Sequence, residues 1–207
     1  MRTQPQDVIY KLEQHNGRLD KETIVFGAMG EGLDEFFEGV TMALDPLVTF
    51  GVKQVPEKAE NEVLSAQGCA WPVFKELADK LIARELTGHA ARDAIELVMS
   101  SATADQWNGF YRRILIKDLR CGVSEKTVNK VAKRFNMKGE TKYVIPTFTC
   151  ALAHDSANHE KKMSGKKQIE VKLDGVRVIT IIQGDKVEMF SRNGKQFHNF
   201  DHIIEEI

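Results

Sequence analysis

The sequence predicts an α+β protein in which an all-helical domain precedes a short antiparallel β-meander. Apolar residues recur at helical spacing as far as about residue 138, and from residue 168 they alternate with polar residues. The stretch between them has no sustained period and contains Gly, Pro, Ser and a run of lysines, as linkers do. We therefore expect a helical domain over 1–138, a linker over 139–167 and an incomplete β-containing domain over 168–207.

The helical domain is expected to carry its own hydrophobic core, since about 138 residues suffice for one. Thr87 and Ser124 stand where an N-cap is expected, and Asn16-Gly17 is a good helix stop. The apolar stripe that includes Trp107 and Phe110 predicts core packing, with no functional role. Helices are expected over 7–15, 21–29, 33–44, 71–86, 87–102, 103–119 and 124–135.

The β-meander is predicted to turn at or just beyond Asp174-Gly175, at Gly184-Asp185 and at Asn193-Gly194. The stretch VRVITII, residues 176–182, is apolar on both faces, which favours a central strand. In the strand before it, alternation places Lys172 on the same face as Glu170 and Asp174.

Charge is distributed unevenly along the chain. Residues 1–102 carry 10 Lys/Arg and 17 Asp/Glu, a net of −7, whereas residues 103–207 carry 19 and 13, a net of +6. The segment 112–142 alone has 10 basic and 3 acidic residues. This pattern is typical of a solvated helix face or of a surface that binds a polyanion such as nucleic acid.

One turn within the basic segment favours the second interpretation. Backbone N–H groups at the start of the helix after Cys121-Gly122 can donate hydrogen bonds to an anion, and cations lie on both sides of the turn. Ordinary helix–turn–helix packing with surface lysines is the alternative. The candidate phosphate-binding residues are Arg112, Arg113, Lys117, Arg120, Gly122, Ser124, Lys126 and Lys130.

Lys172 is a candidate nucleophile. Its amine attacks only when neutral, so its pKa must fall from about 10.4, as burial and a nearby guanidinium both favour. A neutral lysine attacks a carbonyl carbon or a phosphorus, and Arg177 favours phosphorus because its planar fork suits phosphate oxygens. A surface lysine paired with Glu170 or Asp174 is the alternative on spacing alone.

Other features limit the function classes. No run of 18 or more apolar residues exists, which argues against a membrane-spanning helix, and the polar N-terminus lacks a signal-peptide core. Three widely spaced cysteines predict reduced thiols and a cytoplasmic location. Cys150, His154 and His159 form only a weak metal-binding pattern, so no metal ligand is assigned.

The stretch EVKLDGVR, residues 170–177, resembles motif I, KxDGxR, of the covalent nucleotidyltransferases. SRNGKQF resembles their SRxG-type motif and begins at Ser191, 19 residues after the lysine. FYRRILIKDLRCGVSEKTVNKV, residues 110–131, is similar to the DNA-binding domain of ATP-dependent DNA ligases, tailed-phage ligases above all. YVIPTFTCALAHD, residues 143–155, resembles the segment that joins that domain to the catalytic one. The implied fold is a DNA-binding domain followed by the start of an ATP-grasp-like nucleotidyltransferase domain.

The resemblance implies a role for each motif residue. Lys172 is expected to accept AMP from ATP, and Glu170 to lie at the adenine. Asp174 and Arg177 are expected near the ribose, the metal and the nick, and Arg192 near the 5′-phosphate. The implied reaction seals nicks in duplex DNA through a lysyl-AMP intermediate with Mg²⁺, in replication, repair and recombination.

The chain departs from the family pattern after residue 207, because the later motifs and the OB-fold domain do not follow. We expect these residues to be a fragment or a split-gene product that binds DNA but does not complete ligation alone, with a second polypeptide carrying the missing motifs. Two other interpretations stay open: a non-catalytic nick-binding module, and an RNA ligase or capping-type enzyme. The large helical domain argues against the latter.

Overall fold

The computed structural model describes residues 3–59, 68–150, 156–168, 171, 174–184 and 186–206. The chain divides into two compact units, Met1–Pro146 and Thr147–Ile207. Within the described residues, no helix is long and apolar enough to cross a membrane.

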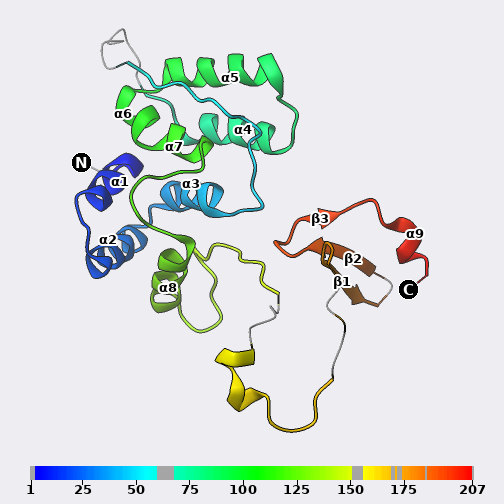
Figure 1. Cartoon of the computed structure of the whole chain (residues 1–207). Helices are drawn as coiled ribbons and strands as arrows, with labels where there is room; N and C mark the ends of the chain where they lie inside the picture. Colours follow the sequence, from blue (N-terminus) through cyan, green and yellow to red (C-terminus); the bar gives the residue numbers. More distant parts are fainter. Residues whose placement is uncertain are drawn as a thin grey trace. The chain divides into compact units, whose positions relative to one another are not determined.

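The first unit consists of helices joined by loops (Figure 1). Helix α4 packs alongside α5, and α8 packs against α2. Thr87 and Ser124 occupy the predicted N-cap positions, although neither hydroxyl caps its helix through a side-chain hydrogen bond. The helices are α1 (Pro5–Glu13), α2 (Arg18–Gly30), α3 (Asp34–Leu44), α4 (Trp71–Ile82), α5 (Gly88–Ser101), α6 (Ala104–Gln106), η1 (Trp107–Tyr111), α7 (Arg112–Leu115) and α8 (Glu125–Phe135).

The stretch predicted as one helix over 103–119 contains a π-helical turn. Residues Trp107–Tyr111 are wound more widely, and the Arg112 amide donates to the carbonyl of Trp107, five residues back. The helix then ends at Leu115, before the predicted residue 119. Its end is a Schellman motif, in which the amides of Lys117 and Asp118 donate to earlier carbonyls and Lys117 adopts a φ of 56°.

The core of this unit contains a cluster of aromatic side chains. Phe36 and Phe110 stack with ring centroids 5.8 Å apart, and Phe74 and Tyr111 stack at 4.3 Å. Gly39 permits the contact between α3 and the wide turn, because a Cβ there would lie 2.5 Å from the Phe110 ring. The apolar stripe of residues 107–115 is therefore buried core, as the sequence predicted.

The chain after α8 continues to pack on the helices as far as Pro146. The Asn129 side chain binds both backbone groups of Ile145: it accepts from the amide at 2.7 Å and donates to the carbonyl at 3.0 Å. Ile145 is buried in the core, and the Tyr143 ring lies 4.3 Å from that of Phe37. The compact unit thus extends beyond residue 138, because side chains of 139–146 supply part of its core.

The second unit contains a small antiparallel sheet with strand order β1-β2-β3. Val178 pairs with Ser191 and Gln183 with Lys186, which confirms the predicted turn at 184–185. Its elements are η2 (Ser156–Asn158), η3 (Glu160–Lys162), β1 (Val178–Gln183), β2 (Lys186–Ser191), β3 (Gln196–Phe197) and α9 (Asp201–Ile204).

The strand predicted to be central, residues 176–182, is not buried on both faces. Among the described residues β1 pairs with β2 alone, and Ile182 is 56% exposed. The apolar sequence predicted burial, but the described residues place no second layer over this strand. Residues 169, 170, 172 and 173 of the strand predicted before it lie outside the described residues.

Candidate functional site

The basic segment 112–142 contains cations whose donors are engaged within the fold. Arg113 is the clearest case: its side chain is 12% exposed and forms an ion pair with Glu13 at 2.5 Å. Its guanidinium also donates to the carbonyls of Asn108, at 3.1 Å, and Leu119, at 2.9 Å. These contacts link α1, the wide turn and the loop after α7, so Arg113 stabilises the unit.

Lys117 and Arg112 are engaged in a similar way. The Lys117 ammonium donates to the carbonyls of Met42 and Asp45 at the end of α3, and burial lowers the pKa of this lysine. Arg112 donates through Nε to the Val55 carbonyl at 2.9 Å and pairs with Glu57 at 3.1 Å. For these three residues, DNA contact stays a prediction, and the structure gives each a role in holding the helices together.

The turn between α7 and α8 is fixed by its backbone and by α2. Lys117, Arg120 and Gly122 all have left-handed backbone conformations, with φ between 53° and 65°. The Lys21 ammonium donates to the Cys121 carbonyl at 2.7 Å, and a Cβ on Gly122 would collide with that ammonium. Gly122 suits the left-handed φ of this position, and any side chain there would displace the Lys21 ammonium.

The predicted residues that face solvent are Arg120, Gly122, Ser124, Lys126 and Lys130. Arg120 makes a loose ion pair with Asp118 at 3.6 Å. Ser124 and Lys126 lie at the start of α8, where backbone N–H groups point out of the helix. The turn thus presents two cations beside a helix N-terminus, which suits a phosphate oxygen.

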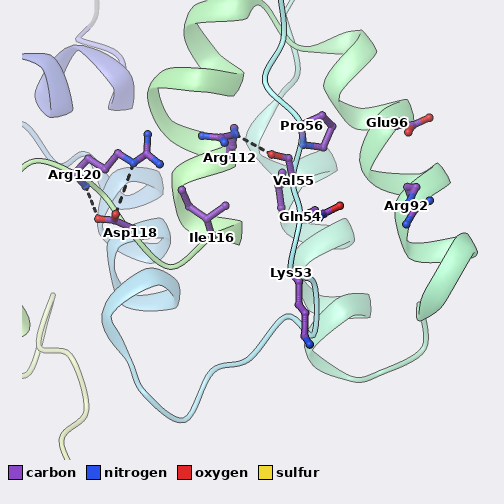
Figure 2. Close-up of a pocket in the computed structure, with 10 residues that line it drawn as sticks. All are labelled: Lys53, Gln54, Val55, Pro56, Arg92, Glu96, Arg112, Ile116, Asp118 and Arg120. Atoms are coloured by element: carbon purple, nitrogen blue, oxygen red, sulfur yellow. Dashed lines mark hydrogen bonds and ion pairs between the residues drawn. The ribbon is translucent and has the colours of Figure 1, made fainter.

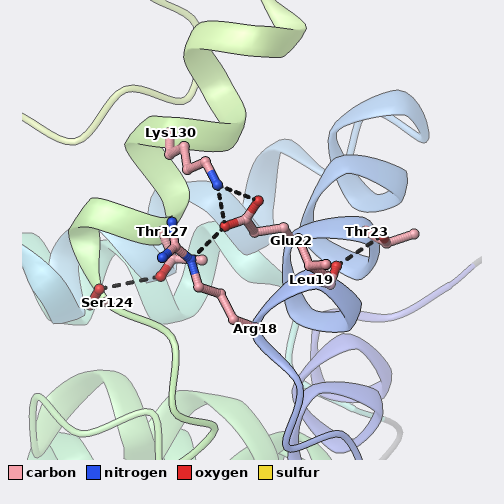
Figure 3. Close-up of polar contacts among 7 residues, drawn as sticks. All are labelled: Arg18, Leu19, Glu22, Thr23, Ser124, Thr127 and Lys130. Carbon is pink, nitrogen blue, oxygen red and sulfur yellow. Dashed lines mark hydrogen bonds and ion pairs between the residues drawn. The ribbon is translucent and has the colours of Figure 1, made fainter.

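Lys130 is held by a buried carboxylate (Figure 3). Its ammonium lies 2.7 Å from Glu22 of α2, whose side chain is only 4% exposed. Arg18 donates to the same carboxylate at 2.9 Å. Hydrogen bonds from Lys130 and Arg18 lower the pKa of Glu22 below its ordinary value. Any phosphate that binds Lys130 must therefore compete with Glu22.

In the second unit, the predicted nucleophile Lys172 and its neighbour Glu170 lie outside the described residues. Asp174, Arg177 and Arg192 are described, and all three are exposed. The Cys150 thiol lies 3.8 Å from the Arg177 guanidinium and 3.7 Å from the Arg192 carbonyl. Cys150 therefore brings Arg177 close to the turn that carries Arg192.

The turn that carries Arg192 is closed by hydrogen bonds and packed by an aromatic ring. The Ser191 amide donates to the Lys195 carbonyl at 2.7 Å, and the Lys195 amide donates to the Ser191 hydroxyl at 3.0 Å. Gly194 has a φ of 86°, and a Cβ there would lie 2.5 Å from Phe148. The sequence did not predict that Phe148 packs on this turn or that Cys150 contacts Arg177 and the Arg192 carbonyl. Their segment resembles a connector and has no local pattern that indicates these contacts.

The described part of this unit offers guanidinium donors to a phosphate-bearing ligand. Two arginines belong to the motifs, and guanidinium forks match phosphate oxygens. Within the described ranges no three His, Cys, Asp or Glu side chains gather as metal ligands. His154 of the weak metal pattern lies outside those ranges. Asp174 is the described motif carboxylate that a Mg²⁺ ion bound to a nucleotide could contact.

Comparison with known proteins agrees with these features. Residues 150–207 match the family model of the ATP dependent DNA ligase domain. The DNA ligases of Enterobacteria phages T4 and T6 are each 28% identical to this chain over 132 residues, covering 61% of this chain and 25% of theirs. These comparisons favour DNA ligases over RNA ligases and capping enzymes.

Two solved structures are similar along nearly the whole chain. Pmar-Lig_Pre has a TM-score of 0.84 and Pmar-Lig_PreS3 one of 0.83. Each is 66% identical, and the match covers 99% of this chain and 45% of theirs. This chain thus spans a quarter of the curated relatives and less than half of the solved ones.

Proposed function

We propose that the chain serves a DNA ligase in two ways, on the premise that residues 150–207 match the family model of the ATP dependent DNA ligase domain. Its helical unit binds nicked duplex DNA, and its second unit contributes the lysine that accepts AMP. The observation that carries the first part is the exposed turn after α7, where Arg120 and Lys126 flank free backbone N–H groups.

Binding through this turn reads the phosphate backbone and not the base sequence. Cations and helix N-termini position a protein on a duplex, whereas base-edge contacts would specify a sequence. A ligase needs such sequence-independent binding because nicks occur in any sequence. The rigid turn, fixed by Lys21 and by three left-handed residues, lowers the entropy lost when a phosphate is bound.

The second unit would act on ATP. The neutral amine of Lys172 forms a bond to the α-phosphorus, the bond from that phosphorus to the bridging oxygen breaks, and pyrophosphate leaves. The lysine nitrogen keeps AMP as a phosphoramidate after losing a proton. AMP then passes to the 5′-phosphate of the nick, and the 3′-hydroxyl displaces it to close the strand.

The other motif residues would orient the nucleotide and the nick. Arg177 and Arg192 would donate to phosphate oxygens, Glu170 would lie at the adenine, and Asp174 would lie near the ribose and the metal. A Mg²⁺ ion, when bound, would offset the negative charge of the phosphates. The Cys150 contacts support this assignment, because they keep the Arg177 guanidinium close to the Arg192 turn.

The family motifs beyond those found here would come from further residues of the same protein or from a second polypeptide. We place the reaction in the cytoplasm of the host of a phage, in line with the origin of the curated relatives and with the free cysteines Cys69, Cys121 and Cys150.

Nick binding is tested by fluorescence anisotropy with the 207-residue chain and a labelled duplex, nicked or intact, over a range of KCl concentrations. We expect tighter binding to the nicked duplex and a log–log salt slope of about −0.9 for each phosphate contacted. Binding that is absent, or that does not respond to salt, contradicts the proposal for the helical unit.

The role of Lys172 is tested with ATP labelled at the α-phosphate and Mg²⁺. Whatever label the chain acquires should disappear in Lys172→Ala and persist in Lys186→Ala, a control that removes an exposed lysine of β2. Label that survives Lys172→Ala refutes the assignment. Nick binding with no label, even when a polypeptide that carries the later family motifs is added, would instead identify the chain as a non-catalytic nick-binding module.

A further inference from the structure

A groove of about 660 Å³ lies on the helical unit (Figure 2). Of the residues predicted to bind phosphate, Arg112 and Arg120 are among those that line it. Residues 53–56 run between its two sides in an extended loop. Arg112, Ile116, Asp118 and Arg120 lie on one side of the loop, and Arg92 and Glu96 of α5 lie on the other. The groove is thus lined by four cations and two carboxylates.

Two of these cations come from the half of the chain that carries net negative charge. Lys53 and Arg92 are both exposed, and within the described residues neither has an ion-pair partner. Arg120 is exposed and only loosely paired, at 3.6 Å from Asp118. The net charge of −7 over residues 1–102 hides these two cations, which the fold places in one groove with Arg112 and Arg120 of the basic segment.

The floor of the groove is held rigidly. The Val55 carbonyl accepts from Arg112, and the Pro56 carbonyl accepts from the Trp107 indole at 2.9 Å. Asn108 binds both the amide and the carbonyl of Lys58, at 3.0 and 2.8 Å. Each of these donors lies in or next to the π-helical turn. Lys53 therefore lies two residues before a backbone segment that is already fixed, which favours binding.

We infer that this groove contacts the phosphate backbone of DNA, chiefly through Lys53 and Arg92; this inference rests on the proposed function. Arg120 belongs both to this groove and to the exposed turn after α7. A duplex that contacts the turn through Arg120 can thus also reach the cations of the groove. The groove is open to solvent, and Lys53, Arg92 and Arg120 lie at the surface, which suits a polymer backbone better than an enclosed small molecule.

The test uses the full chain and the anisotropy assay with nicked duplex. Lys53→Ala/Arg92→Ala removes both ligands, and alanine suits the helical position at 92. The matched control, Lys75→Ala/Lys80→Ala, removes two cations of α4 that pair with acids on the same helix and do not line the groove. We expect the groove variant to bind about 10-fold more weakly and to lose about one to two units of salt slope, with little change in the control.

A second variant tests the charge argument in the opposite direction. Glu96→Gln removes a carboxylate from the groove, and we expect it to tighten nicked-duplex binding about 2- to 5-fold at low salt. Glu31→Gln, which removes an exposed acid outside the groove, should leave the affinity unchanged.

The outcomes separate the two proposals. Salt-dependent binding by the wild-type chain with equal affinities for the groove variant and its control overturns the groove alone. Absence of salt-dependent binding by the wild-type chain overturns the groove and the proposed function of the helical unit together. The groove is supported if the groove variant binds nicked duplex more weakly than its control does. Inorganic phosphate, added at constant ionic strength, should then lower the affinity of the wild-type chain toward that of the groove variant by occupying the wild-type groove.

Discussion

Replacing Lys58 with methionine is expected to destabilise the helical unit markedly. Lys58 is 5% exposed, and its ammonium donates to the carbonyls of Met99, Ser100 and Ala102 at 2.8 to 2.9 Å. These carbonyls lie at the end of α5, where no further helical turn supplies donors. The lysine therefore caps α5 from a distant loop, and methionine keeps its apolar stem while removing the donor.

The expected loss of unfolding free energy depends on whether each carbonyl finds another hydrogen-bond donor once the ammonium is removed. The hydrogen bond to Ala102 is buried, so its acceptor is left without a partner at a cost of about 1–3 kcal/mol. The bonds to Met99 and Ser100 are only partly buried, so water can replace much of the loss. Loss of a cation at the helix C-terminus adds about 0.3–1 kcal/mol. Relief of lysine desolvation offsets part of this, which leaves a net loss of about 2–3 kcal/mol.

Urea unfolding followed by tryptophan fluorescence measures this change. Both tryptophans, Trp71 and Trp107, are buried in the helical unit, so their emission reports this unit alone. With a denaturant slope of about 2 kcal/mol/M, the midpoint should fall by about 1–1.5 M. Lys53→Met is the control, because Lys53 is exposed in the same loop, and it should stay within about 0.5 kcal/mol of wild type. A Lys58→Met midpoint equal to that of the control would refute the reasoning.

Three further predictions concern other parts of the chain. The pKa of Glu22 is lowered in the folded state, so its contribution is present above about pH 4.3 and is lost as the pH falls through the folded pKa; the stability gap between wild type and Glu22→Gln should therefore close on acidification, in urea titrations from pH 7 to pH 3. Gly194→Ala should cost about 1–2 kcal/mol locally and speed amide exchange across residues 191–196, because it strains a φ of 86° and crowds Phe148; unchanged exchange would contradict the packing argument. Arg113→Met should lower stability by about 2 kcal/mol or more, whereas Lys126→Met should leave stability within about 0.5 kcal/mol and weaken nicked-duplex binding; the reverse pattern would mean that burial does not separate structural from DNA-binding cations.

The helices and their core could be predicted because their signal is local. An apolar stripe such as Trp107–Leu115 predicts a buried face whatever it packs against. The π-helical turn within that stripe was not predictable, because side chains in and next to it form hydrogen bonds with the backbone of residues 55–58. Those partners lie about fifty positions earlier in the chain, so no local sequence pattern can indicate the contact.

The candidate site was predictable to a similar degree. Its two motifs are contiguous and specific, and the comparisons support the family that they indicate. The DNA-binding assignment of the cations stays a prediction, and composition cannot distinguish a solvent-facing lysine from Lys117, whose ammonium donates to the carbonyls of Met42 and Asp45. Lys53 and Arg92 were not selected from the sequence, because they are far from Arg120 along the chain. The fold places all three in the lining of one groove.

The anchoring of the loop at residues 55–58 also has a consequence for the order of folding. Its hydrogen bonds join residues 41 to 57 positions apart, so none can form until a long segment of chain has closed. The donors Trp107 and Arg112, and the acceptors at the end of α5, first need their helices. The loop should therefore dock late, after a nucleus built from the α4–α5 and α6–α7 segments, and the groove floor would be among the last surfaces of the unit to become ordered.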